Sequence, residues 1–147
     1  MPVFRITKEF RFEGAHALPG YDGKCRNIHG HSYIMYVTVK GSLINGTGSP
    51  KDGMVVDFKQ LKEIVNENII GKFDHALIMH TGSPLSEELA CAYPNVMLVD
   101  FQPSTENLLC YFAQVLKEKM PQGAELFSLK LHVTASSFAE WYASDNI

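Results

Sequence analysis

The sequence predicts an α+β fold in which a four-stranded antiparallel sheet carries two helices on one face. Two observations lead to this prediction: strand-like segments lie toward both ends of the chain, and two segments with helical spacing lie between them. The order is two strands, a helix, a short strand, a helix and two strands, without an internal repeat. A length of 147 residues suits a single domain, residues 1–147.

Four segments account for the predicted sheet. Residues 3–13 alternate apolar and polar side chains, and residues 29–40 are rich in aromatic and branched side chains. The loop 18–27 between them contains Gly and Pro, so we expect the two strands to pair antiparallel. Toward the end of the chain, residues 125–134 and 138–143 predict two more strands.

Apolar residues recur at helical spacing in two segments. Asp57 is the expected N-cap of the first helix, and Gly71 its expected end. The second helix is expected over 104–120, where Pro121 stops it. Between the helices, the apolar run 96–99 predicts a short buried strand. Two helices cover only one face of the sheet, so we expect oligomerisation to cover the other.

The composition excludes several classes of protein. Hydrophobic residues make up 46% and charged residues 20%, which argues against disorder. A net charge of −3 and a pI near 6.0 provide no broad basic surface for nucleic acid. No segment approaches the roughly 20 apolar residues of a membrane span, and the N-terminal segment is charged, unlike a signal peptide. We therefore expect a cytoplasmic protein without nucleic-acid or membrane partners.

His29-Gly30-His31 is the most informative short motif. Residues i and i+2 of a strand project from the same face, so both imidazoles can reach one metal ion. His16, at the end of the strand expected to pair with this one, could supply a third nitrogen. Three neutral histidines suit Zn²⁺ and leave a fourth position open, as in catalytic zinc sites. The alternative is that His29 and His31 are two exposed strand histidines without a metal.

Cys25 lies four residues before the His-x-His motif, between two basic residues. Cationic neighbours and a nearby metal would stabilise its thiolate, which makes Cys25 a candidate base or nucleophile. Two alternatives stay open: a loop cysteine without a role, or a fourth ligand that closes the zinc site.

The other candidate residues carry weaker signals. Asp74 and His75 follow the first helix, and neighbours in sequence usually do not form a carboxylate–imidazole contact with each other. We expect each of them to contact a residue from elsewhere. Cys91 and Cys110 lie in apolar helical surroundings and are predicted to be core thiols.

Several motifs occur in order along nearly the whole chain. They are Cys25-x-x-x-His29-x-His31 with His16 upstream, the segment 53–58, Asp74-His75, and Pro103-Ser104-Thr105-Glu106-Asn107-Leu108. Together they resemble the family of 6-pyruvoyltetrahydropterin synthase and 6-carboxytetrahydropterin synthase. The spacing of the cysteine and the histidines is more specific than any single motif.

The resemblance implies the tunnelling fold, in which three subunits join their four-stranded sheets into a barrel and two trimers stack as a hexamer. A homo-oligomer of this kind would cover the free face of the sheet. The resemblance also places active sites between subunits, so that Asp74 and His75 could meet Cys25 of a neighbouring chain.

The same resemblance implies a zinc-dependent lyase that acts on 7,8-dihydroneopterin triphosphate. Zinc on His16, His29 and His31 would act as a Lewis acid toward the hydroxyls of the substrate side chain. Cys25 would remove a carbon-bound proton, and His75, oriented by Asp74, would relay protons while triphosphate leaves.

The product is less constrained than the substrate. The short chain and the compact spacing from Cys25 to His29 resemble the bacterial 6-carboxy type, which also releases acetaldehyde and serves queuosine synthesis. The 6-pyruvoyl type, which keeps the whole side chain, is the alternative. A zinc hydrolase with three histidine ligands is a third interpretation, but it leaves Cys25 unexplained.

One position departs from the family pattern. The last strands of the family usually carry a Glu-Thr pair whose carboxylate binds the amino group and ring N–H of the pterin. Here Val133 precedes Thr134, and valine cannot accept a hydrogen bond. Thr105 and Thr134 could still bind the ring, and Glu106 or Glu140 could take the role of the carboxylate. The alternative function is therefore a zinc-containing pterin- or purine-binding oligomer with little turnover.

Overall fold

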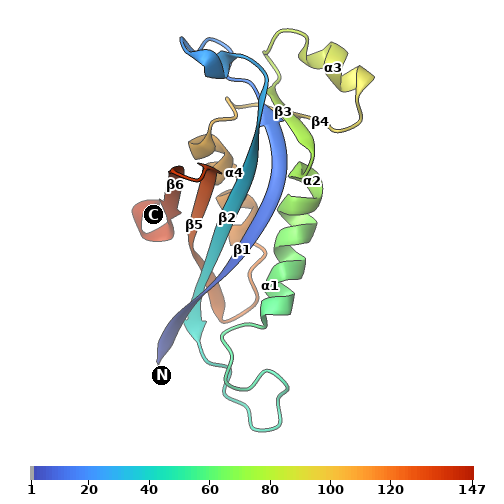
Figure 1. The fold of residues 1–147 in the computed structure, drawn as a ribbon. Helices are drawn as coiled ribbons and strands as arrows, with labels where there is room; N and C mark the ends of the chain where they lie inside the picture. The colour runs from blue at the N-terminus through green and yellow to red at the C-terminus, as the bar shows by residue number, and fades with distance from the viewer. Residues whose placement is uncertain (1) are drawn as a thin grey trace.

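A computed structural model describes residues 2–147, which form a mixed sheet of six strands with helices against one face (Figure 1). The strand order is β4-β3-β1-β2-β5-β6. The first two strands of the chain therefore lie at the centre of the sheet, and later strands extend it on both sides.

The two central strands pair along their whole length. β1 (Val3–His16) and β2 (His29–Ser42) have 14 residues each and run antiparallel, which confirms the predicted pair and lengthens it. Phe10 and Phe12 of β1 are buried, whereas Arg11 between them is exposed. Successive side chains of a strand point to opposite faces, so one face of this ribbon enters the core and the other does not.

The remaining strands make the sheet mixed. β5 (Ala124–Thr134) pairs antiparallel with β2, and β6 (Ser137–Tyr142) pairs antiparallel with β5 and leads to a short 3₁₀ turn, Ala143–Asp145. β3 (Ala76–His80) pairs parallel with β1, and β4 (Val96–Val99) pairs parallel with β3.

The prediction of four antiparallel strands is therefore wrong. The sequence analysis found the strand at β4 but not β3, and it did not place either strand in the sheet. β3 has only five residues, and three of them are buried in a pattern that does not alternate. Hydrophobic periodicity cannot identify a strand of this kind.

The first predicted helix is confirmed, with an irregular middle. The Asp57 side chain accepts a hydrogen bond from the backbone of Lys59 and caps α1 (Phe58–Val65). A π-helical segment, Asn66–Ile70, then joins α1 to α2 (Gly71–Phe73) without a break. The helix packs its apolar stripe against the sheet, as the spacing predicts.

The second predicted helix is α4 (Thr105–Lys117), which Ser104 caps through its side chain. A further helix, α3 (Ser86–Ala92), was not predicted. Cys91 on α3 and Cys110 on α4 are exposed, so the prediction of core thiols is wrong. Cys110 lies off the buried side of α4, and α3 contributes no residue to the hydrophobic core. No helix within residues 2–147 is both long enough and apolar enough to cross a membrane.

Aromatic rings form the centre of the core between the sheet and the helices. The ring of Phe12 stacks on that of Tyr33 with their centres 4.7 Å apart, and it meets the edge of Phe112 at 6.2 Å. Phe112 in turn meets Phe73, which ends the first helical segment. This cluster links β1 and β2 to both long helices.

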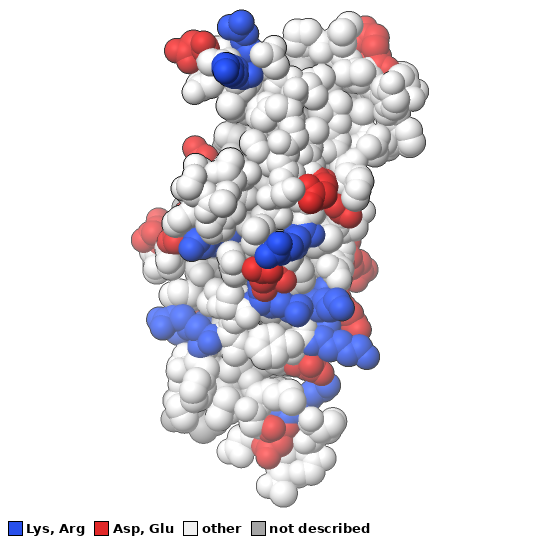
Figure 2. Space-filling model, viewed as in Figure 1, with Lys and Arg blue, Asp and Glu red and all other residues white. Residues whose placement is uncertain are grey.

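The other face of the sheet, called the open face below, carries no helix among the described residues. α4 passes behind β2 and β5 in Figure 1, and the open face is turned toward the viewer. Acidic and basic side chains are intermixed over this face (Figure 2). The Glu9 carboxylate accepts hydrogen bonds from Arg11 and Tyr36, and the Arg5 guanidinium lies 4.2 Å from the ring centre of Phe127.

Candidate metal centre and catalytic residues

Three histidines, called the histidine cluster below, meet at one end of β1 and β2. His16 lies directly opposite His29 in the ladder, and His31 lies opposite Gly14. Their ligand nitrogens all lie within 4.8 Å of one another. Nε2 of His16 is 3.0 Å from Nε2 of His29 and 3.2 Å from Nε2 of His31. The predicted convergence of these three side chains is confirmed.

Backbone carbonyls orient the rings of the cluster. Nδ1 of His16 lies 2.6 Å from the carbonyl oxygen of Pro103, and Nδ1 of His29 lies 2.7 Å from that of Asn27. A carbonyl oxygen can only accept a hydrogen bond, so each of these Nδ1 atoms carries the hydrogen. In the neutral ring, Nε2 then carries a lone pair directed at the other histidines.

The charge state of the rings follows from their burial. Burial lowers the pKa of His16 to about 4, and burial together with the neighbouring His29 lowers the pKa of His31. Both rings are therefore neutral at pH 7, and lone pairs that point into one space repel one another unless a cation lies between them. Neutral imidazoles whose other nitrogen donates to a carbonyl are typical metal ligands. The donor set fits a divalent metal such as Zn²⁺ with a fourth position open.

The aromatic ring of Tyr33 lies against two histidines of the cluster. The ring centre of Tyr33 is 5.4 Å from that of His31 and 6.3 Å from that of His16. Gly14 makes room for this ring, since a Cβ there would lie only 3.1 Å from Cε2 of Tyr33. The packed aromatic core thus restricts the rotation of the histidine rings.

Cys25 lies in a 3₁₀ turn, η1 (Lys24–Arg26), in the loop that joins β1 to β2. Its side chain is half-buried, and its carbonyl accepts a hydrogen bond from the backbone of Leu18 at 2.9 Å. Within residues 2–147 the histidine cluster is the only group of three or more converging candidate ligands, and Cys25 is not part of it. The structure therefore does not place Cys25 as a fourth, closing ligand, and its role as a base or nucleophile stays a prediction.

The start of α4 is tied to the cluster through the chain that precedes it. Pro103, whose carbonyl orients His16, comes two residues before Thr105. Thr105 is half-buried and Glu106 is exposed in the first turn of α4. Two of the predicted substrate-binding residues therefore lie on a helix whose start contacts the metal centre.

Val133 affects the cluster through its backbone. It lies at an irregularity of the β5–β6 ladder, between His132 and Thr134, and its backbone partly offsets the lowering of the His31 pKa by burial. Its side chain packs partly against the core. Glu140, an alternative carboxylate for the pterin, lies instead in a hollow of about 310 Å³ on the open face.

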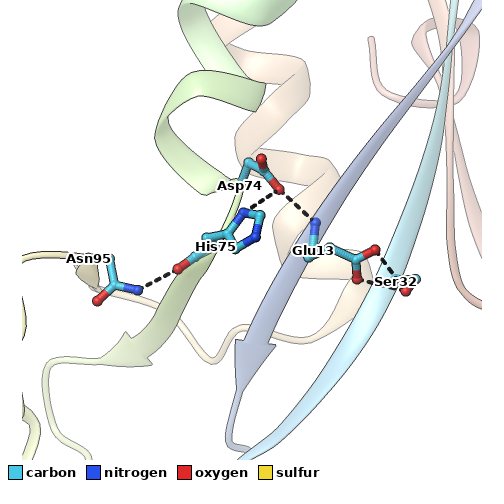
Figure 3. Close-up of polar contacts among 5 residues, drawn as sticks. All are labelled: Glu13, Ser32, Asp74, His75 and Asn95. Carbon is cyan, nitrogen blue, oxygen red and sulfur yellow. Dashed lines mark hydrogen bonds and ion pairs between the residues drawn. The ribbon is translucent and has the colours of Figure 1, made fainter.

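Asp74 and His75 contact each other, so the expectation that they do not is wrong. Nδ1 of His75 is 3.1 Å from Oδ1 of Asp74, and the same oxygen accepts a hydrogen bond of 2.9 Å from the backbone of Glu13 (Figure 3). His75 has φ 64°, a left-handed conformation that costs a non-glycine residue roughly 1–2 kcal/mol. This conformation permits the contact between neighbours in the sequence.

Hydrogen bonds keep Asp74 ionised. The Glu13 N–H, and to a smaller extent His75, lower the pKa of the Asp74 carboxyl. The carboxylate can therefore hold Nδ1–H of His75, which leaves Nε2 of the same ring free to exchange protons.

His75 lines a hollow of about 490 Å³ together with Glu13, Ser32 and Asn95. The Ser32 hydroxyl donates to both carboxylate oxygens of Glu13, at 2.6 and 3.0 Å. The Asn95 side-chain amide donates to the His75 carbonyl at 2.5 Å (Figure 3). Carboxylate, hydroxyl, amide and imidazole groups thus share one concave surface.

The hollow and the histidine cluster adjoin at the ends of β1 and β2. Glu13, Ala15, Gly30 and Ser32 line the hollow, and in their strands they alternate with the residues of the buried face. His31 of the cluster, and Gly14 opposite it, line the same hollow. The hollow therefore extends from the open face to one edge of the candidate metal centre.

The sequence analysis did not single out Glu13, Ser32 or Asn95. The first two were within reach, because placing His16 opposite His29 also places Glu13 opposite Ser32. Nothing in the sequence connects Asn95 with His75, since the contact depends on the unpredicted pairing of β3 with β4.

Solved structures share this fold. An uncharacterized protein from Wolinella succinogenes superimposes with a TM-score of 0.76 at 20% identity, covering 97% of this chain and 99% of that one. The 6-pyruvoyl tetrahydropterin synthase of Caenorhabditis elegans gives a TM-score of 0.71 at 23% identity, covering 97% of both chains. At these identities the likeness defines the fold, and the fold is that of the pterin synthases.

The sequence defines the family. Residues 5–144 match the family model of 6-pyruvoyl tetrahydropterin synthase. The 6-carboxy-5,6,7,8-tetrahydropterin synthase of Haemophilus influenzae is 34% identical over 95% of this chain and 99% of its own length. The chain therefore belongs to the 6-pyruvoyl tetrahydropterin synthase family, as the resemblance of its motifs indicated.

Removing one histidine should abolish stoichiometric metal binding. We expect His29→Ala to weaken the binding of Zn²⁺ by at least about 100-fold, because two nitrogens cannot replace three, and loss of a group that merely hydrogen-bonds to a ligand already costs about 10- to 100-fold. His132→Ala is the matched control, since His132 lies outside the cluster. Elemental analysis after reconstitution and dialysis measures the outcome. Equal metal content in the two variants would contradict the assignment of the site.

The metal-free protein should lose stability as the pH falls from 6.5 toward 4. In the unfolded chain His16 takes up a proton near its ordinary pKa of 6.5, whereas burial delays protonation in the folded chain to about pH 4. Acid therefore favours unfolding in this window, and the contribution is fully present above pH 6.5. Urea unfolding in the presence of a chelator measures the effect. His16→Gln should reduce the slope between pH 6.5 and 4, and an unchanged slope would refute this account.

Proposed function

We propose that this chain is a zinc-dependent lyase that converts 7,8-dihydroneopterin triphosphate to 6-carboxy-5,6,7,8-tetrahydropterin, with loss of triphosphate and acetaldehyde. The observation that carries the proposal is the histidine cluster, whose three Nε2 atoms converge on one space. A relative aligned along almost its full length is named as a 6-carboxy-5,6,7,8-tetrahydropterin synthase, which supports this product over the 6-pyruvoyl alternative.

The residues of the chain divide the chemistry between them. A zinc ion held by the cluster would supply a Lewis acid for the hydroxyls of the substrate side chain. The Cys25 thiolate, in the loop next to the cluster, would accept the carbon-bound proton. His75, with Nδ1 held by Asp74, would exchange a proton through Nε2 as triphosphate leaves.

The working site would combine two chains. The His75 ring is held by Asp74, is largely exposed and is not among the converging nitrogens of the cluster, so a second subunit would be one source of a His75 ring for each cluster. The neighbour's Asp74 would accompany it, because the two side chains are joined within one chain.

Free strand edges support a homo-oligomer, either a trimer or a dimer of trimers. Glu13 directs its N–H and C=O away from β2, toward Asp74 and His75. Alternate residues of a strand share this direction, so β1 offers a row of backbone groups between Val3 and Arg11 with no strand beside them in residues 2–147. β6, the outermost strand on the side away from β4, also has an edge with no strand beside it in residues 2–147. Pairing β6 of one copy with β1 of the next would close a ring.

Four residues would line the pterin end of the site. Thr105 and Glu106 lie at the start of α4, and Val133 and Thr134 lie at the end of β5. Because the Val133 side chain cannot accept a hydrogen bond, the pterin ring would be held less firmly than by a carboxylate. This single feature favours the second candidate function, a pterin- or purine-binding oligomer with little turnover.

A direct assay separates the two candidate functions. Zinc-loaded protein incubated with 7,8-dihydroneopterin triphosphate should release triphosphate and give a product with the mass of the 6-carboxy compound. Cys25→Ala should keep its metal and lose at least about 100-fold of the rate, in line with the contribution of a general base. Cys91→Ala is the control, since its thiol is exposed on α3. Binding without triphosphate release by the zinc-loaded protein would reject the lyase.

Mixed oligomers test whether the site is shared between chains. Cys25→Ala and His75→Ala should each be nearly inactive alone. When the two variants are co-expressed in equal amounts, about a quarter of the sites in a cyclic oligomer should pair an intact Cys25 with an intact His75. Activity near that fraction would support the shared site. Equal inactivity of the mixture, with an oligomeric mass by light scattering, would show that each chain uses its own His75.

A further inference from the structure

His75 is held in its left-handed conformation by hydrogen bonds on both sides of the residue. Its N–H donates to the carbonyl of Glu13 at 2.6 Å, and its own carbonyl accepts from the side-chain amide of Asn95 at 2.5 Å. The first bond continues the pairing of β1 with the start of β3. The second bond comes from the side chain of Asn95, which lies in the connection between α3 and β4.

Asn95 extends the contact between β3 and β4 by one residue. Its backbone carbonyl accepts from the N–H of Leu77 at 3.1 Å, next to the first ladder pair, Leu77 with Val96. Its side-chain amide donates to the carbonyl of His75, the residue before β3. Asn95 therefore bonds both to the N–H of Leu77 in β3 and to the carbonyl of His75.

Without the amide of Asn95, nothing among residues 2–147 holds the His75 carbonyl in this orientation. Histidine prefers negative φ, because positive φ crowds its Cβ against the neighbouring peptide group. Release of the carbonyl would let the backbone relax, and the ring would then turn away from Asp74. Asp74 itself would stay in place, since the backbone of Glu13 holds its carboxylate.

We infer that Asn95 is a positioning residue for the proton-relay step. Its amide fixes the backbone of His75, so that Nδ1 stays on Asp74 and His75 stays in the hollow that it lines together with Asn95. The inference rests on the proposed function of His75. It adds a residue that contacts neither the cluster nor, in this arrangement, the reacting atoms.

Two substitutions test the role of Asn95. Asn95→Ala removes the donor, and Asn95→Asp keeps the shape but offers only acceptors at pH 7. We expect kcat to fall about 10- to 100-fold in both, since a shift of about 1 Å at a catalytic group can cost about 100-fold. KM should stay within about twofold and the metal content should not change, because substrate and metal contacts are untouched.

Asn146→Ala is the matched control, because Asn146 also donates from its side-chain amide to a backbone carbonyl, that of Tyr142, but lies far along the chain from β3. It should keep the kcat of the parent protein. A role of Asn95 in folding alone would lower the melting temperature without separating kcat from KM. An unchanged kcat in both Asn95 variants would overturn the inference.

A spectroscopic measurement does not depend on activity. A residue with positive φ gives a strong nuclear Overhauser effect between its own amide and α protons, so His75 should show this signal in the parent protein and in Asn146→Ala. Both Asn95 variants should weaken it. If the signal weakens while the parent protein releases no triphosphate, the proposed function fails and the positioning of His75 stands. A signal that persists in both variants would refute the positioning role.

Discussion

The register of β1 on β2 is the constraint on which both the core and the metal centre depend. The two strands pair over 14 residues without a bulge, from Val3 with Ser42 to His16 with His29. A slip of one residue would turn every side chain of one strand to the other face. Phe12 would leave Tyr33, and His16 would leave His29 and His31. The burial that stabilises the sheet therefore also specifies the geometry of the metal centre.

The cluster is assembled by distant parts of the chain as well as by its own strands. Pro103, before α4, and Asn27, before β2, supply backbone carbonyls to Nδ1 of His16 and of His29. These bonds fix which nitrogen of each of the two rings carries hydrogen, and so they direct the Nε2 lone pairs inward. The segments before α4 and before β2 thus orient two of the candidate metal ligands.

The candidate catalytic groups of the chain lie at separate places along the central strands. The histidine cluster lies at the ends of β1 and β2, and Asp74 with His75 lies beside β1 at Glu13. In the shared site proposed above, assembly and catalysis would require the same surface. The three imidazoles form the donor set of a metal site, whereas the side chain of Val133 has no hydrogen-bond acceptor.

The sequence by itself determined the features that follow from local periodicity and spacing. These are the two long helices, which follow from helical spacing, and the β1–β2 pair with the convergence of His16, His29 and His31, which follow from strand alternation and an antiparallel return. Only the tertiary structure decided the strand β3, the parallel pairing of β3 and β4, the contact of Asp74 with His75, and the bond from Asn95. Each of these depends on a short segment, or on a left-handed residue, that non-local hydrogen bonds hold in place. Local sequence patterns carry no signal for such interactions.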